Sequence, residues 1–246
     1  MHKFLIFIFC STLIGYSCSY FIELWKKQKI KKLLAKYISK DILDLILSDA
    51  ESSKLGGKRA DVSILFADIR NFTSISDNLE PEEVSSLLNE YFGEMIPIIF
   101  KNNGTVNKFV GDALLIIFGA PVKHEEHPKM AVKCAVEMVK KVKELQKKWQ
   151  AENKALIDIG IGISSGIAFV GNIGSKERQE YSAIGNTVNT ANRLESFNKL
   201  YKTNILICEH THERVKDIIE AKEIDSVCIA RNSEPIKIYE VKTLKY

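Results

Sequence analysis

The chain has 246 residues, with 35 Lys and Arg against 31 Asp and Glu, and a formal net charge of +4. Its 46% hydrophobic and 27% charged residues are typical of a folded globular protein, and 13 glycines with five prolines exclude a collagen-like or low-complexity chain. Six lysines fall within residues 26–36, so the remainder is nearly neutral. Because a nucleic-acid surface should carry its basic charge on the folded domain, we expect no nucleic-acid partner.

The first element in chain order is an apolar stretch. Phe4 to Ile22 holds 19 residues without a charge, which is roughly 28 Å of helix and close to the thickness of a bilayer. The lysines follow this stretch, so the positive-inside rule places the later residues in the cytoplasm. We therefore expect a single-pass anchor in residues 1–25, in the inner or plasma membrane. A cleaved signal peptide is the alternative, although it requires its charge before the apolar core.

Residues 26–60 connect this stretch to the folded domain. After the basic juxtamembrane segment, apolar residues at three-to-four spacing predict an amphipathic helix from Leu33 to Leu47. Ser48 to Ala60 has the composition of a polar linker. The folded domain is expected to occupy residues 61–246.

The folded domain alternates expected strands and helices. Strands are expected at 62–67, 104–110, 113–118, 156–163, 167–170, 205–207, 221–229 and 235–241, and helices from Pro81, at 128–149 and at 186–197. Two strand pairs are joined by short turns, at Gly111-Asp112 and around Gly166, and short turns demand antiparallel pairing. We therefore predict an α+β fold with a mainly antiparallel sheet and packed helices. His124 to His127 lacks the HExxH spacing and is expected to be a solvated loop.

Two carboxylates follow apolar runs. Asp68 ends one strand and Asp112 lies in a hairpin turn, so both should project from the rim of the sheet. With the backbone carbonyl of Ile69 they form a hard-oxygen site suited to Mg²⁺ or Mn²⁺ bridged by substrate phosphates. The polar turn that includes Phe72 and Thr73 exposes backbone N–H groups, which bind phosphate oxygens. The alternative is that each aspartate serves only its turn.

Four motifs in order resemble the class III nucleotide cyclases, most closely the bacterial adenylate cyclases. They are FADIRNFT (66–73), NKFVGDALLIIFGAP (107–121), GIGISSGIAFVGNIG (160–174) and EYSAIGNTVNTANRLE (180–195). The resemblance implies a ferredoxin-like cyclase fold and a homodimer whose active sites are shared. In the family, one protomer supplies the metal-binding residues, and its partner supplies those that bind the base and the ribose and stabilise the transition state.

The resemblance also implies a role for individual residues. Asp68 and Asp112 match the metal-binding aspartates. Lys108 matches the lysine that recognises adenine, and Ser182 occupies the second base-reading position, where Thr or Asp is frequent. The remaining two, Asn189 and Arg193, match the residues that orient the ribose and stabilise the transition state. They lie four residues apart, so one helix face presents both.

The implied reaction converts ATP to 3′,5′-cyclic AMP and pyrophosphate with two Mg²⁺ or Mn²⁺ ions per site. Alternatives are a catalytically silent cyclase-like module for dimerisation or nucleotide binding, and a guanylate cyclase, against which Lys108 argues because guanine would require an acceptor such as Glu there. A diguanylate cyclase is excluded because the hairpin lacks GG[DE]EF. One departure concerns the triphosphate: Ala230 stands where the family often has a lysine.

Overall fold

The structure, a computed structural model, describes residues 2–35, 39–48, 55–229 and 234–245; the side chains of residues 2–15 and 48 lie outside this description. The chain divides into two compact units, Met1–Ser52 and Ser53–Tyr246. The predicted departure at Ala230 falls outside the described residues.

The first unit contains two helices, α1 (His2–Leu34) and α2 (Lys40–Ser48). The single helix predicted from Leu33 to Leu47 is therefore wrong, because α1 ends where that helix was expected to begin. An ion pair of 2.7 Å joins Lys31 of α1 to Asp44 of α2. Most of the predicted membrane span lies outside the described side chains. Among the side chains that are described, no helix offers an apolar stretch long enough to cross a bilayer.

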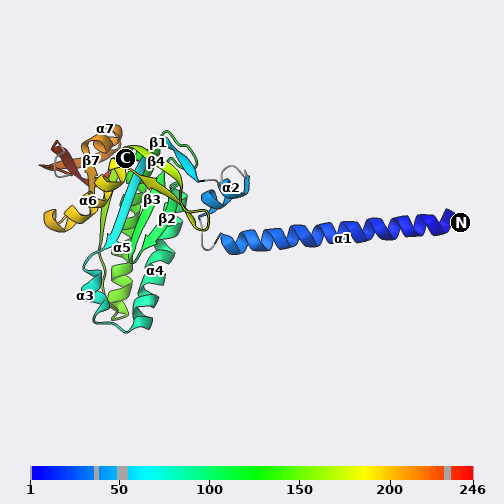
Figure 1. The fold of residues 1–246 in the computed structure, drawn as a ribbon. Coiled ribbons are helices and arrows are strands. Elements are labelled where there is room, and N and C mark those ends of the chain that lie inside the picture. The colour runs from blue at the N-terminus through cyan, green and yellow to red at the C-terminus, as the bar shows by residue number, and fades with distance from the viewer. Residues whose placement is uncertain (1, 36–38, 49–54, 230–233, 246) are drawn as a thin grey trace. The chain divides into compact units, whose positions relative to one another are not determined.

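The second unit is an α+β domain built on one mixed sheet (Figure 1). Its strands are β1 (Gly56–Ile69), β2 (Thr105–Val110), β3 (Ala113–Phe118), β4 (Ile159–Gly174), β5 (Gln179–Ile184), β6 (Ile205–Cys208), β7 (Ile219–Val227) and β8 (Ile236–Leu244). Its helices are α3 (Phe72–Ser76), α4 (Pro81–Lys101), α5 (His127–Ala151), α6 (Asn186–Tyr201) and α7 (Glu209–Val215). The strand order is β2-β3-β1-β4-β6-β8-β7, with β5 paired to β4. Only β4 and β6 pair in parallel among the described strands, so the mainly antiparallel sheet is confirmed.

Helices cover both faces of the sheet. Alternate residues of β1, Leu65, Ala67 and Ile69, are buried in a core that α4 and α5 complete from one face (Figure 1). On the opposite face Leu194 of α6 packs with Leu206 of β6. The period-two alternation of a strand thus assigns Asp68 to the α6 face, because its neighbours Ala67 and Ile69 face the other way.

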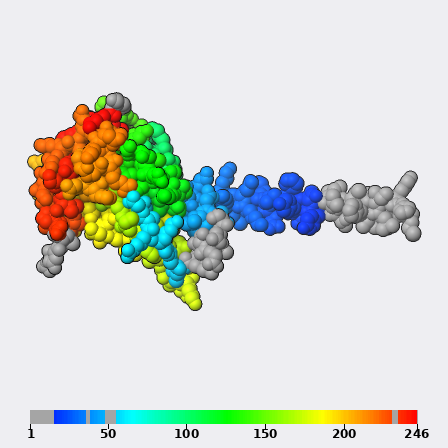
Figure 2. Space-filling view, turned by 90° about the horizontal axis from the view of Figure 1, so that it is seen from above, coloured from blue at the N-terminus to red at the C-terminus, as the bar shows by residue number. Residues whose placement is uncertain are grey.

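Two strand predictions require correction. β1 begins at Gly56, so the predicted linker extends too far, and the strand gains its extra length by pairing Gly56 with Asn172 of β4. The turn predicted around Gly166 does not exist: β4 runs continuously through it, and Gly166 pairs with Val62. In Figure 2 the start of β1 and the β4–β5 hairpin lie side by side and extend from the body of the domain.

Candidate active site

The two predicted metal-binding aspartates meet at one end of the sheet. Asp68 lies one residue beyond the last β1–β3 pair, Ala67 with Leu114, and Asp112 lies in the turn that precedes β3. Burial, followed by the hydrogen bond and negative charge of Asp112, raises the pKa of Asp68 to about 7. The backbone N–H of Ile69 donates to Asp68 Oδ1 at 3.0 Å and opposes this shift. The structure therefore brings both carboxylates together, as predicted.

Two further ionisable groups surround this pair. Burial, with a smaller contribution from the charge of Asp112, raises the pKa of Glu195 on α6 to about 7, and the charge of Arg70 opposes the shift. The Tyr91 hydroxyl on α4 is buried and has no hydrogen-bond partner among the described residues. Burial and the charges of Asp68 and Asp112 raise the pKa of Tyr91 above its usual value. The closely spaced negative charges at this end of the sheet repel one another. A bound divalent cation would relieve this repulsion.

The donor set fits a cation whose coordination is completed by substrate and water. The described residues contain no group of three or more His, Cys, Asp and Glu arranged to hold a metal alone. Two carboxylates and a carbonyl match the way Mg²⁺ binds with few protein ligands and several water or phosphate oxygens. The Ile69 side chain is buried in the core, so only its backbone can contribute to such a site.

The loop after Asp68 is tied to the sheet by Arg70. Its Nε lies 3.5 Å from Asp158 Oδ2, its guanidinium donates to the Thr203 carbonyl, and its backbone N–H donates to the Asp158 carbonyl at 2.9 Å. Asn71 then adopts a left-handed conformation before α3 begins. The Phe72 side chain packs against the core, and Thr73 is exposed. Any phosphate contact at this turn would therefore come from the backbone of the first turn and not from the Phe72 ring.

A second group of site residues lies on β2 and β5. Lys108 Nζ forms an ion pair of 2.8 Å with Glu180 Oε2, and Asn107 Nδ2 donates to the Tyr181 carbonyl, so two contacts join these strands. Glu180 and Ser182 are two residues apart on β5 and project to the same side. The structure thus groups the predicted base-reading residues and adds Glu180, which the sequence analysis missed although it begins the quoted EYSAIGN motif.

Asn189 and Arg193 lie on the exposed side of α6, whose buried side holds Ala191 and Leu194. The residue before the first turn of α6 is Gly185, so no side chain caps the N-terminus of this helix. Within the part of the chain that the structure describes, neither Asn189 nor Arg193 has an intramolecular side-chain partner. Residues two apart on a helix differ by about 200°, so Arg193 and Glu195 project in nearly opposite directions. Because Glu195 faces the carboxylate pair, Arg193 points away from the pair of its own chain.

Comparison with known proteins identifies the family of the chain. Residues 57–243 match the adenylate and guanylate cyclase catalytic domain, and the chain belongs to this family. Among curated relatives, Adenylate cyclase 1 of Rhizobium meliloti is 33% identical over 210 residues, which are 84% of this chain and 31% of that protein. The terminal-differentiation specific adenylate cyclase of Dictyostelium discoideum is 31% identical over 89% of this chain and 10% of that protein. The chain thus spans less than a third of the length of these relatives.

Solved structures include cyclases of both specificities. The adenylyl cyclase CyaB from P. aeruginosa is 36% identical, with a TM-score of 0.72 over 77% of this chain and 97% of that chain. The guanylyl cyclase Cya2 is 35% identical, with a TM-score of 0.69 over 78% of this chain and 96% of that chain. Overall similarity therefore establishes a cyclase catalytic domain, and the choice between adenine and guanine depends on the residues of the site.

Proposed function

We propose that this protein is an adenylate cyclase that converts ATP to 3′,5′-cyclic AMP and pyrophosphate. In this reaction the ribose 3′-oxygen attacks the α-phosphorus, its bond to that phosphorus forms, and the bond to the departing pyrophosphate breaks. Lys108 carries the choice of adenine, because it matches the adenine-recognising lysine in its motif and its ammonium group, held by a 2.8 Å ion pair with Glu180 beside Ser182, can donate to adenine N1. The Glu180 and Ser182 oxygens nearby can accept from the 6-amino group.

Asp68, Asp112 and the Ile69 carbonyl would hold the divalent cations, Mg²⁺ or Mn²⁺, two per site. When bound, such ions lower the pKa of the 3′-hydroxyl and neutralise the charge of the triphosphate. The chain's own residues supply the rest of the chemistry. Asn189 orients the ribose, and the Arg193 guanidinium donates two parallel hydrogen bonds to phosphate oxygens as charge develops there. Backbone N–H groups at Phe72 and Thr73 bind the phosphates.

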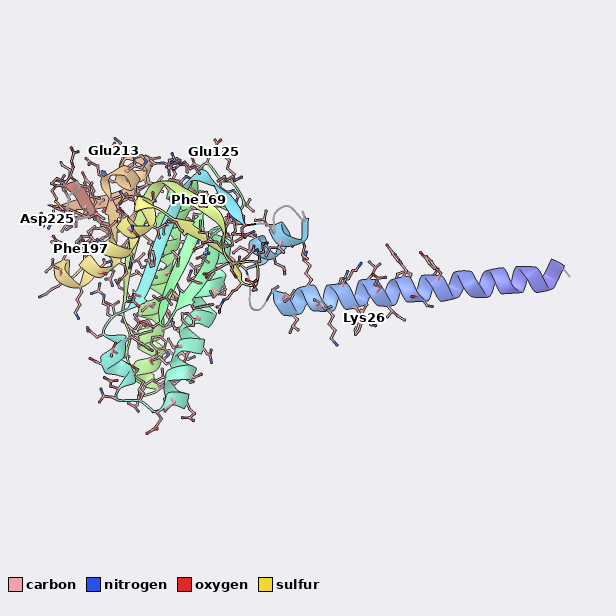
Figure 3. All side chains as sticks on the ribbon, in the orientation of Figure 1. Lys26, Glu125, Phe169, Phe197, Glu213 and Asp225 are labelled. Carbon is pink, nitrogen blue, oxygen red and sulfur yellow. The ribbon has the colours of Figure 1, made fainter. Side chains whose placement is uncertain are left out.

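The active site is proposed to form between two copies of the chain. Arg193 points away from the carboxylate pair of its own chain, so one nucleotide reaches both groups only if a partner supplies one of them. The β4–β5 hairpin also carries an apolar surface that includes Ile167, Phe169 and Ile184, exposed by 60%, 39% and 55% (Figure 3, where Phe169 is labelled). Phe169 and Ile184 are register partners, so they share one face. A symmetric homodimer would contain two shared sites.

A guanylate cyclase is the second candidate, because one observation favours it. The Glu180 carboxylate beside Lys108 is an acceptor that guanine N1–H could use, while Lys108 donated to guanine O6. The two candidates therefore differ in which member of the ion pair contacts the base ring nitrogen. A silent cyclase-like module is the third outcome of the same experiment.

The test uses the purified full chain with Mn²⁺ and either ATP or GTP, with products separated by chromatography. We expect cyclic AMP from ATP and little product from GTP. Asp112→Ala should abolish the activity, and Arg193→Ala should reduce it on the order of 10²–10³-fold. Lys199→Ala, which removes another exposed cation from α6, is the matched control and should retain activity. Preferential formation of cyclic GMP would select the second candidate, and absence of any product the third.

We also propose that residues 1–25 anchor the protein in the inner or plasma membrane, with the catalytic domain in the cytoplasm. The uncharged stretch of Phe4–Ile22 and the lysines that follow it support this proposal. Extraction of membranes at alkaline pH tests it: an integral protein stays in the pellet, and release of the full chain into the supernatant would contradict the anchor.

A further inference from the structure

Helix α6 lies directly on β4 because two glycines of that strand leave no side chain between them. A Cβ atom at Gly162 would lie 2.2 Å from both the Ala191 carbonyl oxygen and the Glu195 backbone nitrogen. A Cβ atom at Gly160 would lie 2.9 Å from Glu195 Oε1. The backbone of the helix therefore approaches the strand closely at Gly162, and the Glu195 carboxylate occupies the space over Gly160.

The position over Gly160 is next to the carboxylate pair. Gly160 is the register partner of Asp68, and such partners project to the same face with their Cβ positions about 4.5–5.5 Å apart. The Glu195 carboxylate and the Asp68 side chain therefore lie side by side on the α6 face of the sheet. The charge of Glu195 contributes to the raised pKa of Asp68, and the charge of Asp112 contributes to the raised pKa of Glu195, as this geometry requires.

Among the described residues, no ion pair neutralises Glu195. Arg70 is held by Asp158 and the Thr203 carbonyl, and it acts on Glu195 only through its charge. The one hydrogen bond described for the Glu195 carboxylate comes from Ser196 Oγ at 3.5 Å. Glu195 is thus a half-buried negative charge that faces the carboxylate pair and is carried by the same helix as Arg193.

We propose that Glu195 is a positioning residue that couples cation binding at Asp68 and Asp112 to the placement of α6. This inference rests on the proposed function of that pair. Without a cation, the negative charges repel Glu195 and its helix, whereas a bound cation attracts both. Because α6 presents Asn189 and Arg193 on its other side, each chain's cation would order the helix that serves the partner's nucleotide. Cation binding in one site would thereby prepare the other.

The experiment measures Mn²⁺ alone binding to the full chain, by electron paramagnetic resonance, and amide hydrogen exchange across residues 186–201. In the natural protein, Mn²⁺ should slow exchange in α6. Glu195→Gln should bind Mn²⁺ about tenfold more weakly and lose most of this slowing, since the attraction of one nearby charge is removed. Gly160→Ala should change both readouts in the same direction, because the added Cβ requires the Glu195 carboxylate to move while its charge is kept.

Two controls make the outcome specific. Glu220→Gln removes the same charge from β7, four strands from β1 in the sheet, and should behave like the natural protein. Asp68→Asn should lose Mn²⁺ binding. If Glu195→Gln and Gly160→Ala bind Mn²⁺ and slow α6 as the natural protein does while Asp68→Asn does not bind, the inference is overturned and the proposed function stands. If Asp68→Asn binds as tightly as the natural protein, the cation site itself is wrong and both fall.

Discussion

Asp68→Asn is expected to make the metal-free protein more stable while removing its activity. In the folded protein the pKa of Asp68 is raised from 3.8 to about 7. Between these values the folded state holds a proton that the unfolded state has lost, so this group makes stability fall as pH rises, and its full cost applies above pH 7. The shift corresponds to ~4 kcal/mol before screening. Because the side chain is only partly buried, solvent reduces the cost to about 1–2 kcal/mol.

Asparagine removes the charge and keeps the shape, so it should recover this cost. For a domain of this size, 1–2 kcal/mol is about 2–8 °C in Tm. Thermal unfolding in EDTA should therefore show a higher Tm for Asp68→Asn at pH 8 and little difference at pH 4, where the folded protein carries a protonated Asp68. Asp77→Asn, an exposed aspartate in the same region, is the control. An equal gain at both pH values, or no gain at pH 8, would refute the reasoning.

Three further predictions concern other parts of the domain. His127 forms a hydrogen bond of 2.8 Å with Ser63, and burial and the charge of Arg214 lower the pKa of His127 below 6.5. As pH drops below about 6.5 the unfolded state therefore takes up a proton before the folded state does, and the free energy of unfolding should fall. Urea unfolding across pH 5–8 tests this, and an unchanged midpoint would be the contrary result. Gly162→Ala should cost more than about 2 kcal/mol, read by urea unfolding, because its Cβ meets α6 backbone. Lys108→Ala should raise KM for ATP at least about tenfold with the fold intact by circular dichroism, and an unchanged KM would remove this lysine from base reading.

The place of the principal site residues in the fold could be predicted from the motifs because each motif is contiguous and local, whereas their roles stay predictions. Asp68 and Asp112 each follow an apolar strand, so the sequence alone predicts that they project from the end of the sheet. The pairing of β1 with β3 then brings the two aspartates close together, because these strands are antiparallel neighbours. The helix that carries Asn189 and Arg193 was likewise expected from its own periodicity.

The residues that the sequence did not reveal depend on packing between distant segments. Glu195 ends a quoted motif, yet its position beside Asp68 follows only from the seating of α6 over Gly160. Glu180 acquires a role only when β5 approaches Lys108. His127 was expected in a solvated loop, but it is buried at the start of α5 because Ser63 and Arg214 provide hydrogen bonds from other elements. None of these contacts leaves a local pattern.

Gly166 shows the opposite error, in which a local signal is misleading. Glycine between two apolar runs usually marks a turn, but here its unusual backbone angle, φ 149°, is accommodated within a continuous strand. Pairing with β1 along the full length of β4 outweighs the local preference. The same pairing converts Gly56 and Gly57 from an expected linker into strand.

Mixing two inactive variants tests the shared active site most directly. Asp68→Ala removes a group from the cation side, and Arg193→Ala removes one from the nucleotide side. If one chain supplies each side, a heterodimer of the two variants retains one intact site. We predict that the mixture recovers some cyclic AMP formation, with about a quarter of the natural rate as the upper limit when the chains exchange at random, and less where the cation of one site orders the helix of the other. No recovery in a mixture with proven heterodimers would contradict the account.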